Sequence, residues 1–166
     1  PLGGGGLISG IAMAAKSLRP SIRVIGVEPE VADDARQSFL SGQIVRIPQP
    51  QTIADGVATQ AVGKLTFPVL RALVDDIVTV SESQIAEALL LILSRAKQVV
   101  EPTAALGVAA LLSGRLRRPG KVAALTDGRF VGRRGLVLGR SVDMGPTALV
   151  TVGGIAVVVT SIRLQA

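Results

Sequence analysis

The stretch Pro1-Leu2-Gly3-Gly4-Gly5-Gly6-Leu7 opens the chain, and apolar residues at helical spacing follow it from 7 to 18. Consecutive glycines leave no side chains in the way, so their backbone N–H groups can converge on an anion. The positive end of the dipole of the following helix would point at the same place. The stretch therefore predicts a phosphate-binding loop, and the alternative interpretation is a flexible glycine linker.

The position of this loop also bears on the extent of the domain. A phosphate loop of this kind lies between a strand and a helix, and the sequence begins without that strand. We therefore expect the chain to be a fragment that starts inside a domain.

Apolar runs and helical patterns alternate through the next part of the chain. The runs predict strands at 22–27, 76–80 and 121–125, and the periodic patterns predict helices at 33–40, 68–74, 82–99 and 102–112. Ser81 is expected to cap the third of these helices, because Ser81-Glu82-Ser83-Gln84 matches a capping box. Strands that alternate with helices indicate an α/β fold, here a partial parallel sheet with flanking helices.

The pattern changes after Thr126. Glycine and arginine punctuate residues 128–140, and two β-rich runs at 148–152 and 155–159 then flank Gly153-Gly154, which predicts a β-hairpin. We place a boundary near Asp127, between an α/β domain of residues 1–127 and a tail of residues 128–166. The tail is too short to bury a core of its own, so it must pack on something else or remain poorly ordered.

The composition excludes several classes of chemistry. The 166 residues include no Cys and no His, which excludes disulfides, thiol catalysis, Ser–His–Asp triads and the usual zinc sites. With three Phe and neither Trp nor Tyr, the chain also lacks an aromatic platform for single-stranded nucleic acid. The absence of Cys is compatible with the cytoplasm, and the sequence has neither a membrane-spanning run nor the basic start of a signal peptide. We therefore expect a cytoplasmic protein that contacts no membrane.

The net charge of +6 is concentrated in one part of the chain. Eight Lys or Arg residues lie between 115 and 140, where Asp127 is the single acidic residue. Such a patch can bind nucleic acid or another anionic surface, whereas the alternative is a solvated basic loop. Because no nucleic-acid motif accompanies the charge, we do not expect nucleic acid as a partner.

Five motifs in residues 1–127 occur in the order and approximate spacing of one known enzyme group. They are Gly3-Gly4-Gly5-Gly6-Leu7, Val27-Glu28-Pro29 with Ala32-Asp33-Asp34, Thr52-Ile53-Ala54-Asp55-Gly56-Val57, Val74-Asp75-Asp76-Ile77 and Glu101-Pro102-Thr103-Ala104-Ala105. In these motifs the chain resembles serine racemase and biosynthetic-type threonine dehydratase, which are fold-type II enzymes that use pyridoxal 5′-phosphate (PLP). The resemblance implies a large-domain fragment of an enzyme that deaminates or racemises serine or threonine, in a family that is usually homo-oligomeric.

The resemblance also implies roles for residues around the cofactor. Gly3, Gly4, Gly5 and Gly6 would hold the PLP phosphate, Gly56 would bring its backbone close to the cofactor ring, and Glu101 would lie near the cofactor. Thr126 would place a hydroxyl opposite the pyridine nitrogen, although Asp127-Gly128-Arg129 after it departs from the family pattern. Gly56 and Thr126 also have plain interpretations, as a turn glycine and a strand-end residue.

Glu28, the carbonyl of Ala32 and Asp34 match the divalent-cation site of serine racemase. Two carboxylates and a backbone carbonyl are hard oxygen ligands, which suit Mg²⁺ or Ca²⁺. The alternative interpretation is an ordinary acidic cap at Glu28 and a surface charge at Asp34.

The catalytic lysine of the family is the residue that this sequence lacks. Enzymes of this class need a lysine that forms a Schiff base with PLP, and in the family it lies well ahead of the glycine loop. The lysines of this chain, Lys16, Lys64, Lys97 and Lys121, stand in other contexts, and Lys16 is expected to face solvent. Three hypotheses therefore remain: a dehydratase or racemase (or part of one) with an amino-acid substrate, a non-catalytic PLP- or phosphate-binding remnant, and a basic interaction module.

The tail carries a second and weaker resemblance. Residues 127–131, 142–148, 152–155 and 158–161 resemble the C-terminal region of the microcystin-degrading metallopeptidases (microcystinase C). The metal ligands of that family lie elsewhere in its chain, and a chain without His cannot carry them, so we infer no protease activity. The join between the two parts suggests a fusion, a rearranged gene or an assembly artefact.

Overall fold

The computed structural model describes residues 1–116, 122–126, 148–152 and 155–162. In chain order the elements are α1 (Gly6–Leu18), β1 (Ile25–Pro29), α2 (Asp34–Ser41), the 3₁₀ turn η1 (Asp55–Val57), α3 (Phe67–Leu73), β2 (Asp76–Val80), α4 (Glu82–Leu91), the π-helical turn η2 (Ile92–Ala96), α5 (Pro102–Leu112), β3 (Val122–Thr126), β4 (Ala148–Val152) and β5 (Ile155–Ile162). The predicted helices and strands are therefore present, with their ends displaced in some cases.

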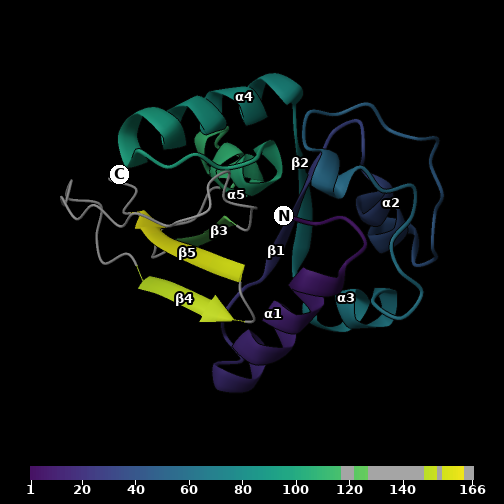
Figure 1. The fold of residues 1–166 in the computed structure, drawn as a ribbon. Coiled ribbons are helices and arrows are strands. Elements are labelled where there is room, and N and C mark those ends of the chain that lie inside the picture. Colours follow the sequence, from purple (N-terminus) through teal and green to yellow (C-terminus); the bar gives the residue numbers. More distant parts are fainter. Residues whose placement is uncertain (117–121, 127–147, 153–154, 163–166) are drawn as a thin grey trace.

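β1 and β2 form a parallel pair, in which Ile25 lies opposite Asp76 and Pro29 opposite Val80. Their apolar side chains alternate between two cores. Val27 and Val80 pack with residues of α4 and α5, whereas Ile77 packs with residues of α1 and α3. Helices thus lie on both sides of the sheet (Figure 1), which confirms the predicted α/β fold with a small parallel sheet.

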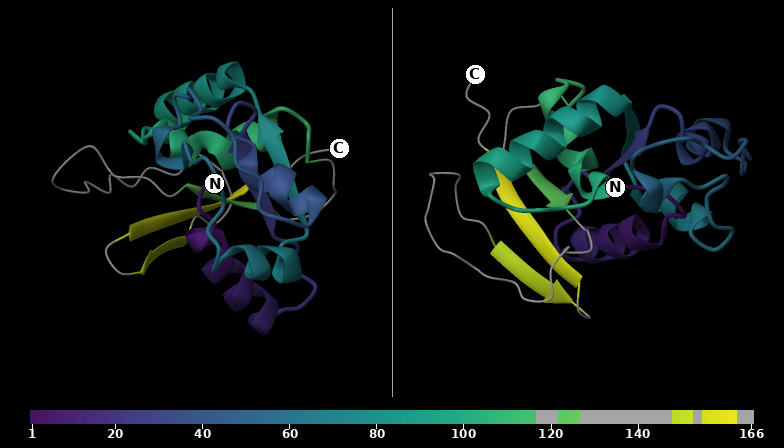
Figure 2. Two further views of the ribbon diagram at one scale, coloured as in Figure 1. Left: turned by 90° about the vertical axis from the view of Figure 1, so that its right-hand side faces the viewer. Right: turned by 45° about the horizontal axis from the view of Figure 1, so that its top comes forward.

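A second, antiparallel sheet has the strand order β3-β5-β4. β4 and β5 form the hairpin that the two β-rich runs predict, with Val152 opposite Ile155 (Figure 2). β5 also pairs with β3, from Val122 opposite Ile162 to Thr126 opposite Val158. The strand predicted at 121–125 is therefore present, but in the described chain it pairs with the tail rather than with β1. The boundary near Asp127 and the segment that follows it to residue 147 lie outside the described residues.

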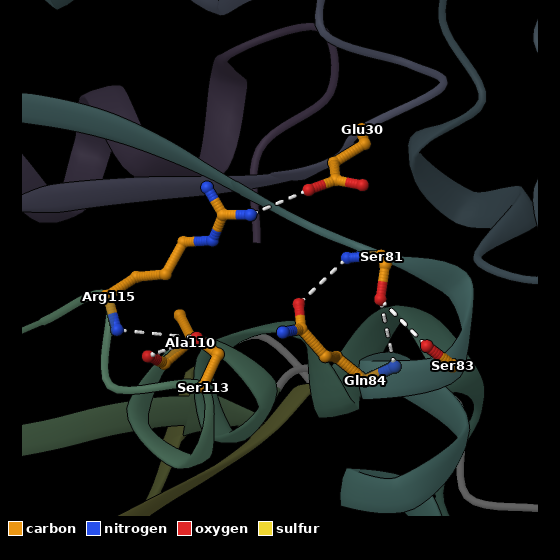
Figure 3. A network of polar contacts seen from close by, with 7 residues as sticks. All are labelled: Glu30, Ser81, Ser83, Gln84, Ala110, Ser113 and Arg115. Atoms are coloured by element: carbon orange, nitrogen blue, oxygen red, sulfur yellow. Dashed lines mark hydrogen bonds and ion pairs between the residues drawn. The ribbon is translucent and has the colours of Figure 1, made fainter.

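The predicted capping box is present at the start of α4 (Figure 3). The Ser81 hydroxyl accepts the backbone N–H of Gln84 at 3.3 Å, and the Gln84 side chain accepts the N–H of Ser81 at 2.9 Å. The predicted end of this helix at residue 99 is wrong, because α4 ends at Leu91 and η2 ends where Lys97 takes a left-handed φ of 57°. A residue in that conformation cannot continue a right-handed helix, and Pro102 already begins the next one.

Lys16, predicted to face solvent, instead forms an ion pair. Its Nζ lies 2.7 Å from Oδ2 of Asp75, which also accepts the backbone N–H of Val24 at 2.7 Å. Burial raises the pKa of Asp75, but the hydrogen bonds from Lys16 and Val24 outweigh that effect and leave it below its ordinary value. This pair ties α1 to the start of β2.

The glycine-rich start of the chain lies against the edge of β1. The N–H of Leu2 donates to the carbonyl of Val27 at 3.0 Å, so residues 1 and 2 run beside β1 before the chain turns into α1. The glycine loop, which follows Leu2 directly, is thus held beside β1, whose neighbour in the parallel pair is β2.

No helix in the described ranges is both long enough and apolar enough to cross a membrane.

Candidate functional site

The glycine loop forms one wall of a small cavity of about 220 Å³. Its lining comprises residues 1–8 together with Gly56, Val57, Glu101 and Thr103. The structure thus brings together the predicted cofactor residues Gly3, Gly4, Gly5, Gly6, Gly56 and Glu101. Thr126 ends β3 as a buried residue and is not among the described residues that line this cavity, so its role stays a prediction.

The start of α1 supplies the donors of the cavity. Gly5 is the N-cap residue of α1, and its left-handed φ of 88° is a conformation that glycine adopts without strain. The first N–H groups of any α-helix have no partner within that helix. In α1 these groups belong to the residues that line the cavity, and no acidic side chain occupies the first turn. The wall can therefore accept an anion at the positive end of a helix of 13 residues.

Two glycines of the loop are not explained by contacts within the protein. A Cβ atom added to Gly4 or Gly6 would meet nothing within 4 Å, although both residues line the cavity. By contrast, a Cβ atom on Gly3 would lie 3.1 Å from the Cα of Val57. The open space over Gly4 and Gly6 is where a bound phosphate group would fit, so these residues suit the anion that the sequence predicts.

The opposite wall joins η1 to the first turn of α5. The N–H of Gly56 donates to the hydroxyl oxygen of Thr103 at 3.2 Å, and a Cβ atom on Gly56 would approach that oxygen to 2.8 Å. Close contact with Thr103 is thus a reason for glycine here, besides the predicted approach of the cofactor. Glu101 is the N-cap residue of α5, but its side chain makes no capping hydrogen bond.

Thr103 and Val57 are cavity residues that the sequence reasoning missed. Both lie inside motifs that carry the family resemblance, in which Glu101 and Gly56 drew the functional interpretation. Thr103 is 4% exposed, and a buried hydroxyl that holds a backbone N–H is easily taken for a packing residue. The signal that could have found it is its place two residues after a predicted cofactor residue, at the start of a helix.

The three predicted metal ligands lie together beneath the N-terminus of α2. Glu28, Ala32 and Asp34 are each fully buried, and the Glu28 carboxylate accepts the N–H groups of Ala35 at 3.1 Å and Arg36 at 2.8 Å. The interpretation of Glu28 as a helix cap is therefore confirmed, whereas that of Asp34 as a surface charge is wrong. Asp34 accepts the hydroxyl of Thr59 at 3.2 Å.

The two carboxylates have no cationic partner within the described chain, whose ion pairs are Lys16–Asp75 and Arg115–Glu30. Burial raises the pKa of Glu28 to about 8, and the nearby charge of Asp34 adds to this rise. Burial also raises the pKa of Asp34 to about 6. The two buried carboxylates repel each other, and a divalent cation bound between them would neutralise both. The pair therefore fits such a cation. The described residues offer no group of three or more acidic ligands, so such a site depends on the Ala32 carbonyl as well.

Lysine is missing from the cavity as the structure describes it. Lys16 is paired with Asp75, and neither Lys64 nor Lys97 is among the lining residues. Lys121 lies outside the described residues. The described cavity can therefore bind an anion, but it offers no lysine side chain to form a covalent bond with a carbonyl group.

Comparison with known proteins decides the family. The sequence pattern of the family described as "Pyridoxal-phosphate dependent enzyme" matches residues 1–128. The chain belongs to this family. Its relatives include the L-threo-3-hydroxyaspartate ammonia-lyase of Saccharomyces cerevisiae, 46% identical over 89% of this chain and 46% of the relative. The serine racemase of Arabidopsis thaliana is 52% identical over 70% of this chain and 35% of the relative.

Solved structures of the family share the fold. The threonine deaminase of T.th. is 53% identical, with a TM-score of 0.70 over 72% of this chain and 44% of that chain. The serine racemase of maize is 47% identical, with a TM-score of 0.67 over 69% of this chain and 35% of that chain. This chain thus spans less than half the length of these relatives.

The second resemblance predicted from the sequence is also found. The pattern described as "MlrC C-terminus" matches residues 92–166, a range that begins well ahead of the predicted residue 127. It overlaps the first match from 92 to 128, a stretch that contains α5 and β3.

Proposed function

We propose that this chain binds pyridoxal phosphate through the glycine loop and belongs to an enzyme that acts on 3-hydroxy-α-amino acids. The observation that carries the proposal is the cavity of about 220 Å³ in which Gly4 and Gly6 face open space at the N-terminus of α1. The substrate class is the one shared by the named relatives, whose names refer to serine, threonine and 3-hydroxyaspartate.

In this proposal the loop residues hold the phosphate by backbone N–H groups, and the dipole of α1 favours its negative charge. Gly56 and Glu101 border the rest of the cofactor from the opposite wall, where Thr103 keeps the backbone of Gly56 in place. Pyridoxal phosphate, when bound, serves as an electron sink for electrons released at the substrate Cα. The predicted role of Thr126 opposite the pyridine nitrogen remains part of the proposal.

We also propose that Glu28, Asp34 and the Ala32 carbonyl bind Mg²⁺ or Ca²⁺. The support is the burial of two acidic side chains that have raised pKa values and lack a cationic partner in the described chain. A cation there would stabilise the junction between β1 and α2, because Glu28 also holds the N-terminus of that helix.

A second candidate function is non-catalytic binding of the cofactor. The observation that favours it is that the lysines of the described residues lie away from the cavity. Under this candidate the chain binds PLP without a covalent bond. An absorbance spectrum separates the two, because a lysine-bound cofactor absorbs at longer wavelength than the free aldehyde.

Three further expectations from the sequence also remain proposals. They are a cytoplasmic location, assembly into homo-oligomers and a solvated basic segment between 115 and 140 rather than a nucleic-acid surface. A basic interaction module would be supported by nucleic-acid binding that weakens steeply with salt.

The experiment that tests the proposed function is equilibrium dialysis of the purified chain against PLP, with inorganic phosphate as competitor. We expect saturable binding that phosphate reduces, and the loss of both effects in Gly4→Val, whose side chain would occupy the open space of the cavity. PLP binding that ignores phosphate and tolerates Gly4→Val would contradict the proposal.

A further inference from the structure

We propose that Thr66, assisted by Gly63, is a positioning residue that orients the glycine loop so that the N–H of Gly5 faces the phosphate. This inference rests on the proposed function, because it concerns the same phosphate-binding loop. Neither residue lines the cavity, and neither is assigned a role by the family motifs described above.

The carbonyl oxygen of Gly4 is the point at which the loop is held. It accepts the backbone N–H of Gly63 at 3.0 Å and the hydroxyl of Thr66 at 2.6 Å. These donors lie about 60 residues further along the chain, at the turn that leads into α3. A loop of consecutive glycines has little conformational preference of its own, so two hydrogen bonds to one carbonyl largely decide the orientation of that peptide group.

The direction of the Gly5 N–H follows from this contact. In a trans peptide the carbonyl oxygen and the N–H of the next residue point to opposite sides, and no described peptide bond of the chain is cis. The Gly4 carbonyl points to the 63–66 turn, so the N–H of Gly5 points away from it. The cavity is lined by the glycine loop but by no residue of that turn, which places the N–H on the cavity side.

Thr66 is the N-cap residue of α3, yet its side chain does not cap this helix. A threonine at this position normally accepts an N–H of the first turn, which stabilises the helix. Here the hydroxyl contacts the carbonyl oxygens of Gly4 and Gly63 instead, at 2.6 and 3.0 Å. The Thr66 side chain thus binds the glycine loop and does not cap its own helix.

Close packing around the same hydroxyl accounts for two further glycines. A Cβ atom on Gly5 would lie 2.7 Å from Oγ1 of Thr66, and one on Gly63 would lie 2.8 Å from it. Gly4 and Gly6, by contrast, have open space over their Cβ positions. The loop therefore has one side packed against Thr66 and another side free for a ligand.

The test compares Thr66→Val, which removes the hydroxyl at nearly constant shape, with Thr66→Ser, which keeps it. Thr79→Val is the matched control, because the Thr79 hydroxyl of β2 makes no hydrogen bond within the described part of the chain. We expect the Kd values of PLP and of inorganic phosphate to rise about tenfold in Thr66→Val, as for one lost charge-assisted hydrogen bond. Thr66→Ser and Thr79→Val should bind like the wild type.

Two further measurements separate positioning from general loss of structure. Pyridoxal, which lacks the phosphate, should bind the wild type and Thr66→Val equally. The amide proton of Gly5 should shift on addition of phosphate in the NMR spectrum of the wild type, and this shift should be absent in Thr66→Val. Gly63→Ala, which crowds the same hydrogen bonds, should reproduce the selective loss.

Undiminished phosphate binding by Thr66→Val, or equal weakening in Thr66→Ser, would overturn the inference while the proposed function stands. Equal weakening of pyridoxal and PLP binding would also overturn it, because the defect would then be general. A wild-type chain that binds neither PLP nor phosphate would overturn the proposed function, and the inference with it.

Discussion

The N–H of Gly56 and the hydroxyl of Thr103, 47 residues apart, form a hydrogen bond of 3.2 Å that joins η1 to the first turn of α5. This bond holds together the wall of the cavity that faces the glycine loop. Because Thr103 is buried and a Cβ atom on Gly56 would touch its hydroxyl, neither position has room for a larger side chain.

Thr103→Val should therefore destabilise the chain more than its small change in size suggests. The variant removes the acceptor of the Gly56 N–H, and a typical intramolecular hydrogen bond contributes about 0.5–1.5 kcal/mol to stability. Urea unfolding should show this loss for Thr103→Val, whereas Thr103→Ser, which keeps the hydroxyl, should lose less. Equal stability of the wild type and Thr103→Val would show that the hydrogen bond contributes nothing to the fold.

The stability of the metal-free chain should fall as the pH rises from about 5 to about 8. The pKa of Glu28 is raised from 4.5 to about 8 and that of Asp34 from 3.8 to about 6. Between about pH 5 and about pH 8 the folded chain binds more protons than the unfolded chain, so the free energy of unfolding decreases as the pH rises. The decrease should be on the order of a few kcal/mol.

Unfolding by urea at several pH values, in the presence of a chelator, measures this slope. Glu28→Gln should flatten the slope, because the amide cannot ionise. Glu30→Gln is the matched control, since Glu30 is exposed and paired with Arg115 (Figure 3). A slope that Glu28→Gln leaves unchanged would assign the pH dependence to other groups.

Ca²⁺ or Mg²⁺ should raise the melting temperature of the chain at pH 8. A cation that binds the folded state alone stabilises it by mass action, and at this pH Asp34 is ionised and Glu28, with its pKa of about 8, is partly ionised. Asp34→Ala should abolish the rise, whereas Asp33→Ala should retain it, because the Asp33 side chain bonds to Gln37 on the surface of α2. Equal metal-induced shifts in the two variants would exclude Asp34 as a ligand.

Contacts that are local in sequence were predicted well, and contacts between distant residues were not. The capping box at Ser81 depends on four consecutive residues, and β2 depends on one apolar run, so both could be predicted from the sequence. The ion pair of Lys16 with Asp75 and the hydrogen bond from Thr66 to the Gly4 carbonyl join residues about 60 positions apart. Such contacts arise only when the sheet brings α1 and the ends of α3 together.

The candidate site shows the same division between local and distant signals. The glycine run and its helix carry their chemistry in one short stretch, whereas Thr103 becomes a cavity residue only through its contact with Gly56. The pairing of β3 with β5 was also unpredictable, because an apolar run specifies a strand but not its neighbour.

The purified chain should release no 2-oxo acid from serine or threonine in the presence of PLP and Mg²⁺. The physical reason is that Lys16, Lys64 and Lys97 lie outside the cavity, so a lysine that could hold the cofactor or remove the Cα proton is lacking among the described residues. Coupled detection of pyruvate and 2-oxobutyrate measures this. Robust turnover would show that one lysine of the chain, Lys121 included, reaches the cofactor.

The most direct test of the central claim, that the glycine loop binds the cofactor phosphate, compares Gly6→Ala with Gly10→Ala. Both residues lie on α1 with nothing within 4 Å of their Cβ positions, but only Gly6 lines the cavity. Neither change should destabilise the ligand-free chain, since alanine favours a helix over glycine by up to about 1 kcal/mol. In equilibrium dialysis we predict weaker PLP binding by Gly6→Ala and unchanged binding by Gly10→Ala. Equal PLP affinity of these two variants would contradict the account.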